Sequence, residues 1–154
     1  MNPETTKKLR QAGFTMLEIL IVVTIIGALM AIVANRFLSR QVDAKISLAA
    51  TQMRQLEQAL ELYRLDNGRY PTTEQGLRAL SREPTTGPTP KRYPPGAYVE
   101  ARMLRDPWDE IFNYQLPGEH NAHSFDLYSF GPDGQEGGET VNADIVNWDT
   151  EAID

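Results

Sequence analysis

The fold of this chain is decided by residues 14–34, which read FTMLEILIVVTIIGALMAIVA. This run contains a single charged side chain, that of Glu18. At a helical rise of about 1.5 Å per residue it spans roughly 30 Å, the thickness of the hydrocarbon core of a bilayer. The run is longer than the apolar region of a secretory signal peptide, and no A-x-A cleavage pattern closes it. Residues 14–34 are therefore predicted to form a transmembrane helix.

The preceding segment, residues 1–13, is basic. It holds three basic side chains and one acidic side chain: Lys7, Lys8, Arg10 and Glu4. Basic residues that flank a membrane span stay on the cytoplasmic side, which predicts a single pass with everything from residue 35 onward exported. On hydropathy alone, a plain signal anchor explains these features equally well.

Glu18 is the feature that favours more than a plain anchor. A carboxylate that faces lipid without a partner costs roughly 2.5–3.5 kcal/mol, so such residues are usually paired or functional. A natural partner is an α-amine at Phe14, which exists only if the chain is cleaved between Gly13 and Phe14. That amine would lie one helical turn away in the same subunit, or on a neighbouring subunit shifted along the helix axis.

The residues around this junction resemble the prepilin cleavage and methylation motif of type IV pilins and type II secretion pseudopilins. The motif has a basic leader, a Gly-Phe junction, a glutamate at the fifth position and a long apolar run, all of which are present here. The resemblance implies that a prepilin peptidase cleaves between Gly13 and Phe14 and N-methylates Phe14. It also implies that Glu18 recruits the next subunit by pairing with its N-terminus.

Beyond residue 34 the chain becomes amphipathic. Apolar residues recur at spacings of three and four with charged residues on the opposite face, and neither proline nor glycine lies between Met30 and Asp66. We predict one continuous helix of about 50 residues from near Phe14 to near Leu65, ended by Asp66-Asn67-Gly68. A coiled coil is the lesser alternative, because the repeat lasts only about three heptads. The apolar stripe consists of Val42, Ile46, Ala49, Met53, Leu56, Leu60 and Tyr63.

A second helix is predicted over residues 73–81. Thr72 and Gln75 have the spacing of a capping box, with reciprocal side-chain caps, and Leu77 and Leu80 are expected to pack inward. Five prolines within residues 84–95 then predict a surface loop with a restricted backbone.

Two short strands are predicted over residues 111–115 and 125–130. Residues 116–124 connect them and predict an antiparallel hairpin. His120 and His123 in this connection have a conceivable metal-ligand spacing, but solvated loop histidines are the simpler interpretation because no other soft ligand is near in sequence.

Composition narrows the function. The formal net charge of −6 argues against a nucleic-acid partner, whose phosphates require a basic face. The chain contains no cysteine, so no disulfide braces its loops. We find no nucleophile–base combination and no phosphate-binding loop in the sequence, and we therefore do not expect an enzyme.

The segment GPDGQEGGETVNAD, residues 131–144, is termed the acidic loop. It is rich in glycine and in hard oxygen ligands of the kind that Ca²⁺ prefers. Asp133 and Asp144 bracket it, but Gln135 and Gly137 stand where an EF-hand has ligands. On composition alone, a solvated glycine-rich turn is the simpler interpretation.

Further stretches are similar to the G-type major pseudopilin family of type II secretion. They are YPTTEQGL (70–77), DPW (106–108), FDLYSFGPDG (125–134) and DIVNW (144–148). The likeness covers nearly the whole chain after the Gly-Phe junction, and it implies one Ca²⁺ in the acidic loop, in place of the disulfide of type IV pilins. Carried onto this sequence, the ligands are the side chains of Asp133 and Asp144 and the carbonyl of Phe130, with Asn142 as a further candidate.

The resemblance implies a pilin-like α+β fold with a long N-terminal helix on a small antiparallel sheet. It divides the chain into a cleaved leader (1–13), a transmembrane and filament-core helix (14–34) and a periplasmic domain (35–154). The implied protein is a single-pass bacterial inner-membrane subunit with its C-terminal domain in the periplasm. It polymerises into the pseudopilus that drives export of folded proteins across the outer membrane.

The implied partners are further copies of the chain, minor pseudopilins, the prepilin peptidase, the inner-membrane assembly platform and membrane lipid. One alternative is a type IV pilus subunit, although the cysteine pair typical of that group is missing. Another is a signal-anchored periplasmic calcium-binding protein or enzyme, which leaves the Gly-Phe junction and Glu18 as coincidences.

Two positions depart from the family pattern. The family commonly has proline where this chain has Asn35, which leaves open whether the helix kinks there. It commonly has a Gly-Asn pair where this chain has Asp109-Glu110, which alters only a turn.

Overall fold

The computed structural model describes residues 15–148, apart from the side chains of residues 31–39. The chain divides into two compact units, Met1–Ser39 and Arg40–Asp154. The predicted cleavage site at Gly13 and Phe14 lies outside the described residues.

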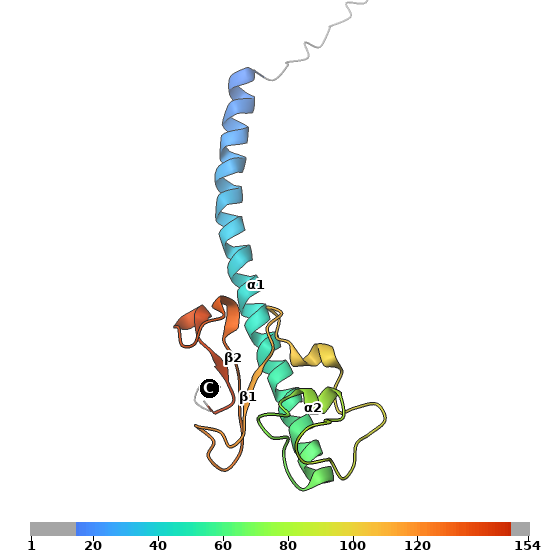
Figure 1. Cartoon of the computed structure of the whole chain (residues 1–154). Coiled ribbons are helices and arrows are strands. Elements are labelled where there is room, and N and C mark those ends of the chain that lie inside the picture. Colours follow the sequence, from blue (N-terminus) through green and yellow to red (C-terminus); the bar gives the residue numbers. More distant parts are fainter. Residues whose placement is uncertain (1–14, 149–154) are drawn as a thin grey trace, which may run out of the picture. The chain divides into compact units, whose positions relative to one another are not determined.

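A single helix, α1, runs from Met16 to Asn67 and confirms the predicted continuous helix within the described residues (Figure 1). It passes through Gly27 and Asn35 without interruption. It ends where Gly68 adopts a positive φ of 76° and donates its N–H to the Arg64 carbonyl at 2.7 Å. A left-handed glycine is a common helix terminator, as the sequence predicts here.

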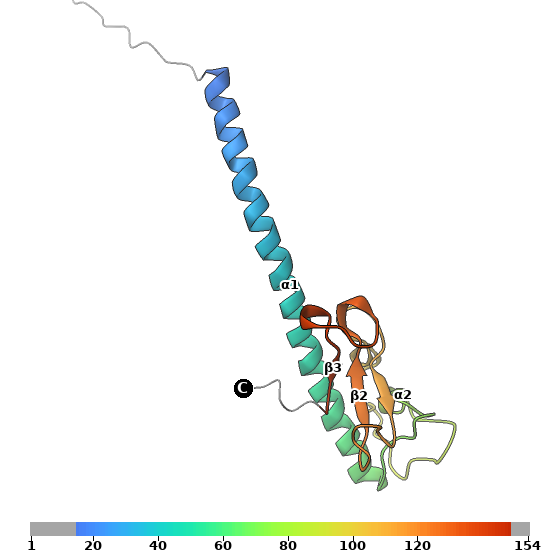
Figure 2. The same ribbon diagram turned by 90° about the vertical axis from the view of Figure 1, so that its left-hand side faces the viewer.

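The core of the second unit forms on the apolar stripe of α1. Leu56, Leu60 and Tyr63 are completely buried, which confirms the predicted packing face for this half of the helix. In Figures 1 and 2 the sheet runs alongside this part of α1. Buried partners from the rest of the unit complete one cluster: Leu77, Ala79, Leu80, Leu104, Phe112, Phe125 and Leu127.

The sheet has three antiparallel strands in the order β1-β2-β3. β1 (Asn113–Gln115) and β2 (Asp126–Ser129) form the predicted hairpin. β3 (Ile145–Val146) pairs with the other edge of β2 and was not predicted, because two residues are too few to show a period-2 pattern.

Both predicted strands are longer than the observed ones. Ile111 forms an isolated bridge with Arg105 instead of joining β1. Phe130 ends β2 because it is the N-cap of the 3₁₀-helix η2 (Gly131–Asp133). The two other 3₁₀-helices are η1 (Ala101–Leu104) and η3 (Thr140–Asn142).

The prediction of a helix over residues 73–81 is wrong in extent, since α2 covers only Arg78–Ser81. The predicted capping box does form: the Gln75 N–H donates to Thr72 Oγ1 at 3.2 Å, and the Thr72 N–H donates to Gln75 Oε1 at 3.1 Å. It caps a turn, because Gly76 adopts a left-handed φ of 58° that interrupts helical geometry. Leu77 and Leu80 are buried as predicted.

The proline-rich loop is tied to this turn. The side-chain amide of Gln75 donates to the carbonyls of Thr86 and Pro88 at 2.8 and 3.0 Å. At the end of α1, Asn67 is buried and its Oδ1 accepts the Arg92 N–H at 3.0 Å. The side chains of Gln75 and Asn67, which lie outside the loop, therefore hold this segment in place although it contains no helix or strand.

Asp126, the first residue of β2, organises the connection between β1 and β2. It is 2% exposed, and its carboxylate accepts the N–H groups of His120 at 2.8 Å and Asn121 at 2.9 Å. Burial alone would raise the pKa of Asp126, but these backbone hydrogen bonds lower the pKa below its usual range. The ionised carboxylate is therefore the form that stabilises the folded connection.

We expect Asp126→Asn to lower the free energy of unfolding at pH 7 by about 1–3 kcal/mol, because an amide cannot accept bonds at both terminal atoms. The carboxylate's contribution is fully present above its unfolded-state pKa of about 3.9, and it is lost as pH falls through the lower folded-state pKa. Urea unfolding of a fragment from Asn35 onward, at pH 7 and pH 3, measures both effects. Asp43→Asn, at an exposed position of α1, is the matched control. Equal pH dependence for wild type and Asp126→Asn would contradict this account.

Candidate functional site

The described N-terminal part of α1 is apolar on every side. The large hydrophobic side chains between Met16 and Met30 are from 46% to 93% exposed. A helix that is hydrophobic all round requires burial in a larger assembly or in a membrane. Taken over the described residues, no helix reaches the length and apolarity needed to cross a bilayer. Phe14 and the side chains of residues 31–34, which the predicted span includes, lie outside the description.

Glu18 lies in the first turn of α1 and closes a capping box with Thr15. The Glu18 N–H donates to Thr15 Oγ1 at 3.2 Å, and the Thr15 N–H lies 3.5 Å from Glu18 Oε2. Among the described residues this long contact is the only hydrogen bond to the carboxylate. Glu18 therefore keeps acceptor capacity for a further donor, as the predicted pairing with an amine requires.

The N-terminal end of the acidic loop is fixed by Asp106, a buried residue. Its Oδ1 accepts the N–H groups of Trp108 at 2.9 Å and Glu110 at 3.0 Å, and its Oδ2 accepts the Ser129 hydroxyl. Ser129 Oγ in turn accepts the Gly131 N–H at 3.2 Å. The chain therefore leaves β2 and enters the loop in a direction set by side-chain hydrogen bonds.

The C-terminal end of the loop is fixed by Asn147. Its Oδ1 accepts the Leu127 N–H at 3.0 Å, and its own N–H donates to the Leu127 carbonyl at 3.1 Å. Its side-chain amide donates to the Phe125 carbonyl at 3.2 Å. Sequence patterns do not single out Asn147 for this role, because both partners lie about twenty residues away; the only local signal is the apolar pair before it.

Inside the loop, η2 and η3 pack against each other. The Gly137 N–H donates to Asp144 Oδ2 at 2.9 Å. Gly138 has a φ of 91°, and a Cβ at this position would collide with the carbonyl oxygen of Asn142. Position 138 therefore requires glycine twice over, for its backbone conformation and for the space.

The predicted cation ligands were tested against this geometry. Asp144 Oδ1 is buried and has no hydrogen-bond partner among the described residues, which is costly for a carboxylate oxygen unless a cation or donor meets it. Asp133 is exposed and accepts the Gln135 N–H at 3.2 Å. Phe130 caps η2, and a carbonyl has two lone pairs, so its oxygen can also ligate.

Asn142 is exposed, and its carbonyl oxygen packs close to Gly138. The described residues contain no group of three or more His, Cys, Asp or Glu side chains gathered as for a metal. A cation here would therefore take two carboxylates and complete its shell with carbonyl oxygens, a donor set that suits Ca²⁺.

Negative charge accumulates around this end of β2. Burial, followed by the charges of Glu136, Asp126 and Asp144, raises the pKa of Tyr128. Burial is the largest cause of this shift, and the carboxylates add to it.

The two histidines of the β1–β2 connection are placed differently. The His120 ring stacks on Trp148 with the centroids 4.0 Å apart, and its Nδ1 lies 3.1 Å from Asp126 Oδ2. His123 is exposed. His120 thus helps to hold the segment that follows β3 against the connection.

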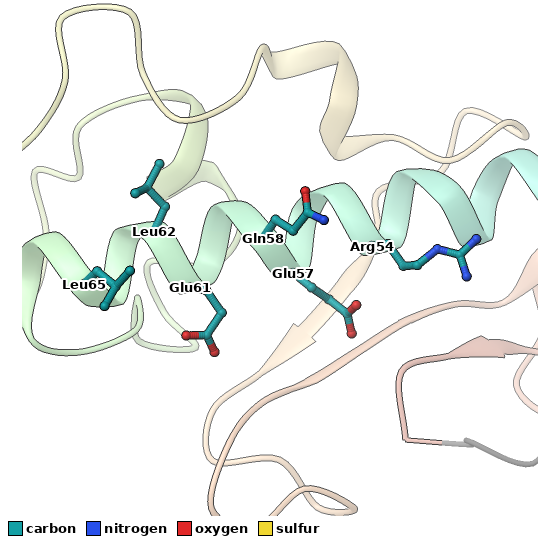
Figure 3. A pocket seen from close by; sticks show the side chains of 6 residues that line it. All are labelled: Arg54, Glu57, Gln58, Glu61, Leu62 and Leu65. Carbon is teal, nitrogen blue, oxygen red and sulfur yellow. The ribbon is translucent and has the colours of Figure 1, made fainter.

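A further surface lies along one face of α1 (Figure 3), an open groove of about 590 Å³. Burial raises the pKa of Glu57, whereas hydrogen bonds from Tyr70 and Arg64 lower the pKa of Glu61. All its lining residues come from this one helix, so it lacks the convergent groups of a small-molecule site. They are Arg54, Glu57, Gln58, Glu61, Leu62 and Leu65.

Comparison with known families decides between a pseudopilin, a type IV pilus subunit and a signal-anchored periplasmic protein. A family model described as "Type II secretion system (T2SS), protein G" matches residues 36–148. The chain belongs to this family. A second model, the prokaryotic N-terminal methylation motif, matches residues 8–34, the segment that contains Gly13, Phe14 and Glu18.

Individual members of this family are similar to this chain over most of its length. The type II secretion system core protein G of Pseudomonas aeruginosa is 44% identical over 140 residues, which cover 91% of this chain and 96% of the relative. That of Vibrio cholerae is 45% identical over 143 residues, covering 92% and 95%. The crystal structure of the major pseudopilin of enterohaemorrhagic Escherichia coli matches with a TM-score of 0.61 and 40% identity, over 71% of this chain and 87% of that one.

These matches confirm the resemblance found in the sequence and the α+β pseudopilin fold. The chain is a structural subunit of the type II secretion pseudopilus. The protein G match favours this assignment over the type IV pilus and over a signal-anchored enzyme.

Proposed function

We propose that this subunit waits in the inner membrane as a single-pass protein with its C-terminal domain in the periplasm, and is then added to the base of a filament. The observation that carries the proposal is the uncovered apolar surface of α1 from Met16 to Met30, directly within the segment that matches the methylation motif. In lipid this surface is covered by acyl chains, and in the filament it is covered by α1 of neighbouring copies. Apolar area then stays out of water throughout assembly.

Glu18 would direct each addition. A new subunit whose Phe14 amine has been freed by cleavage after Gly13 can donate to the Glu18 carboxylate of its neighbour, at a membrane depth where an unpaired charge is costly. The pairing requires one axial offset between subunits, so it also sets their stagger.

Growth of the filament would push or gate folded proteins through the outer membrane, so the action is mechanical. We propose that the chain has no catalytic role of its own and is instead a substrate of the prepilin peptidase. Its further partners would be copies of itself, minor pseudopilins and the inner-membrane assembly platform.

The acidic loop would bind one Ca²⁺ through Asp133, Asp144 and the Phe130 carbonyl, with Asn142 as a further donor. Asp144 Oδ1, which is buried and has no partner within residues 15–148, supports this proposal. A bound divalent cation would neutralise the two carboxylates and cross-link the two arms of the loop, which no disulfide can do in a chain without cysteine.

The first prediction concerns processing. In cells with an active prepilin peptidase, mass spectrometry of the mature chain should show an N-terminus at Phe14 that carries one methyl group. Gly13→Ala, which changes only the residue before the scissile bond, should reduce cleavage. A mature chain that still begins at Met1 would rule out the proposed processing.

The second prediction separates the charge of Glu18 from its capping role. Glu18→Gln keeps a side chain that can close the capping box but removes the charge, so it should leave cleavage intact and abolish filaments seen by electron microscopy. Thr15→Val removes the other half of the capping box and keeps the charge, so it should still assemble. Normal filaments from Glu18→Gln would show that charge pairing is not required.

The third prediction concerns Ca²⁺. A ligand that binds only the folded state stabilises it by about 2.7 kcal/mol at a hundredfold excess over its Kd. A fragment from Asn35 onward should therefore melt at a lower temperature in chelator than in millimolar Ca²⁺. Asp144→Ala and Asp133→Ala should melt low in both conditions, whereas Glu139→Ala, at an exposed position, should respond like wild type. Identical melting of the wild-type fragment with and without Ca²⁺ would remove the metal site.

A further inference from the structure

A groove of about 690 Å³ opens between the turn that leads into α2 and the outer edge of β1. The sheet ends at this edge, because the strand order is β1-β2-β3 and nothing among the described strands pairs with β1 on its other side. Arg78 and Ser81 of α2 line one wall, and Asn113 and Tyr114 of β1 line the other.

Tyr114 lines this groove, and its main chain points away from β2. Its opposite residue on β2, Leu127, uses both its N–H and its carbonyl toward Asn147, on the β3 side. Since strand residues alternate in direction, Tyr114 and Leu127 form a non-hydrogen-bonded pair, and Tyr114 turns its N–H and carbonyl away from β2. The N–H groups of Phe112 and Leu116, two residues to each side, also point outward, where they meet Leu104 and Thr73. We find no partner for the Tyr114 groups among the described residues.

The rim of the groove is basic although the chain as a whole is acidic. Arg78 and Arg82 are exposed and form no ion pair with another described residue, and Arg105 has a 3.6 Å contact with Asp109. Among the residues that the structure describes, Glu74 is the only acidic one that lines the groove. Ile111, 43% exposed, adds an apolar contact. An extended, acidic segment with one apolar side chain would match the free backbone groups, the charges and this contact together.

We propose that residues 149–154 of a second copy occupy this groove. They read DTEAID, which supplies three carboxylates for the arginines, an isoleucine for Ile111, and main-chain groups that can pair with Tyr114 by strand addition. The segment follows β3, which lies at the opposite edge of the sheet from β1. In its own copy the segment follows Trp148, whose ring stacks on His120 in the β1–β2 connection, so the choice of a second copy rests on the packing of copies in the filament.

The inference rests on the proposed function, because a filament places copies side by side at high effective concentration. Each copy would then offer its β1 edge to one neighbour and its acidic segment to another. Contacts of this head-to-tail kind propagate along a filament without closing.

The absence of native cysteine permits a direct test in the full chain. Two full-length variants, Ser81→Cys in the groove and Ala152→Cys in the acidic segment, are expressed together in cells that assemble filaments, and mild oxidation follows. A disulfide between positions 81 and 152 can then join only different copies, and peptide mass spectrometry identifies it. Ala122→Cys, at an exposed position outside the groove, replaces Ser81→Cys in the matched control.

We expect the 81–152 link at a yield at least several times that of the 122–152 control. Filaments that are visible by electron microscopy but give no excess of the 81–152 link would overturn the inference while leaving the proposed function intact. The double variant, carrying both cysteines on one full-length chain dispersed in detergent, provides the second arm. Efficient linking within that single chain would show that the groove takes its own segment and would overturn the assignment to a second copy.

A binding measurement keeps the inference testable if filaments do not form. A synthetic peptide of residues 149–154 should bind the full-length chain in detergent, and added salt should weaken it. Arg78→Glu and Arg82→Glu should each weaken it about two- to fivefold, as the loss of an exposed ion pair predicts. Arg92→Glu, an exposed arginine outside the groove, should leave binding unchanged. No binding, or equal loss from all three variants, would overturn the inference.

Discussion

The rest of this structure depends on a mismatch between the apolar surface of α1 and the amount of chain available to cover it. From Ala49 to Tyr63 the helix buries one stripe against the sheet and loops of its own unit. From Met16 to Met30 it exposes large hydrophobic side chains in every direction. Water cannot cover that surface at low free energy, so the subunit is complete only with lipid or with other copies. Assembly is in this sense a continuation of folding.

The domain itself is held by buried polar groups more than by its strands. Strands of two to four residues do not form a stable sheet alone. Asp106 and Asp126 accept main-chain N–H groups from connecting segments, and Asn147 accepts the N–H of Leu127 in β2. Because their partners are backbone groups, these three side chains fix chain direction wherever regular hydrogen bonding ends. This is how a unit without disulfides keeps long connections ordered.

The sequence predicts the parts of this architecture that follow local rules. The length and end of α1 follow from periodicity and from Gly68, and the β1–β2 hairpin follows from two short apolar runs. The extent of α2 was mispredicted because the left-handed conformation of Gly76 is a tertiary choice that composition does not reveal. Strand β3 and the hydrogen bonds of Asn147 were not predicted, because their partners lie far away in sequence. For the acidic loop, residue types suggested Asp133 and Asp144, but only the fold shows that one Asp144 oxygen is buried with no partner in the described part of the chain.

The position of β3 after the acidic loop has a mechanical consequence. Its two residues pair only with β2, and the loop that returns the chain to β2 joins Ser129 to Ile145 without passing through the main core. β3, the loop and Asn147 are thus attached to the rest of the unit through β2, through Phe125 and through Ile145, which packs against the core cluster. A pull from the C-terminal side of β3 would act first on these attachments, because they come before the rest of the unit along the chain from that side. The acidic loop and β3 therefore lie between the C-terminal side of the chain and the core, and they bear a pull from that side before the core does.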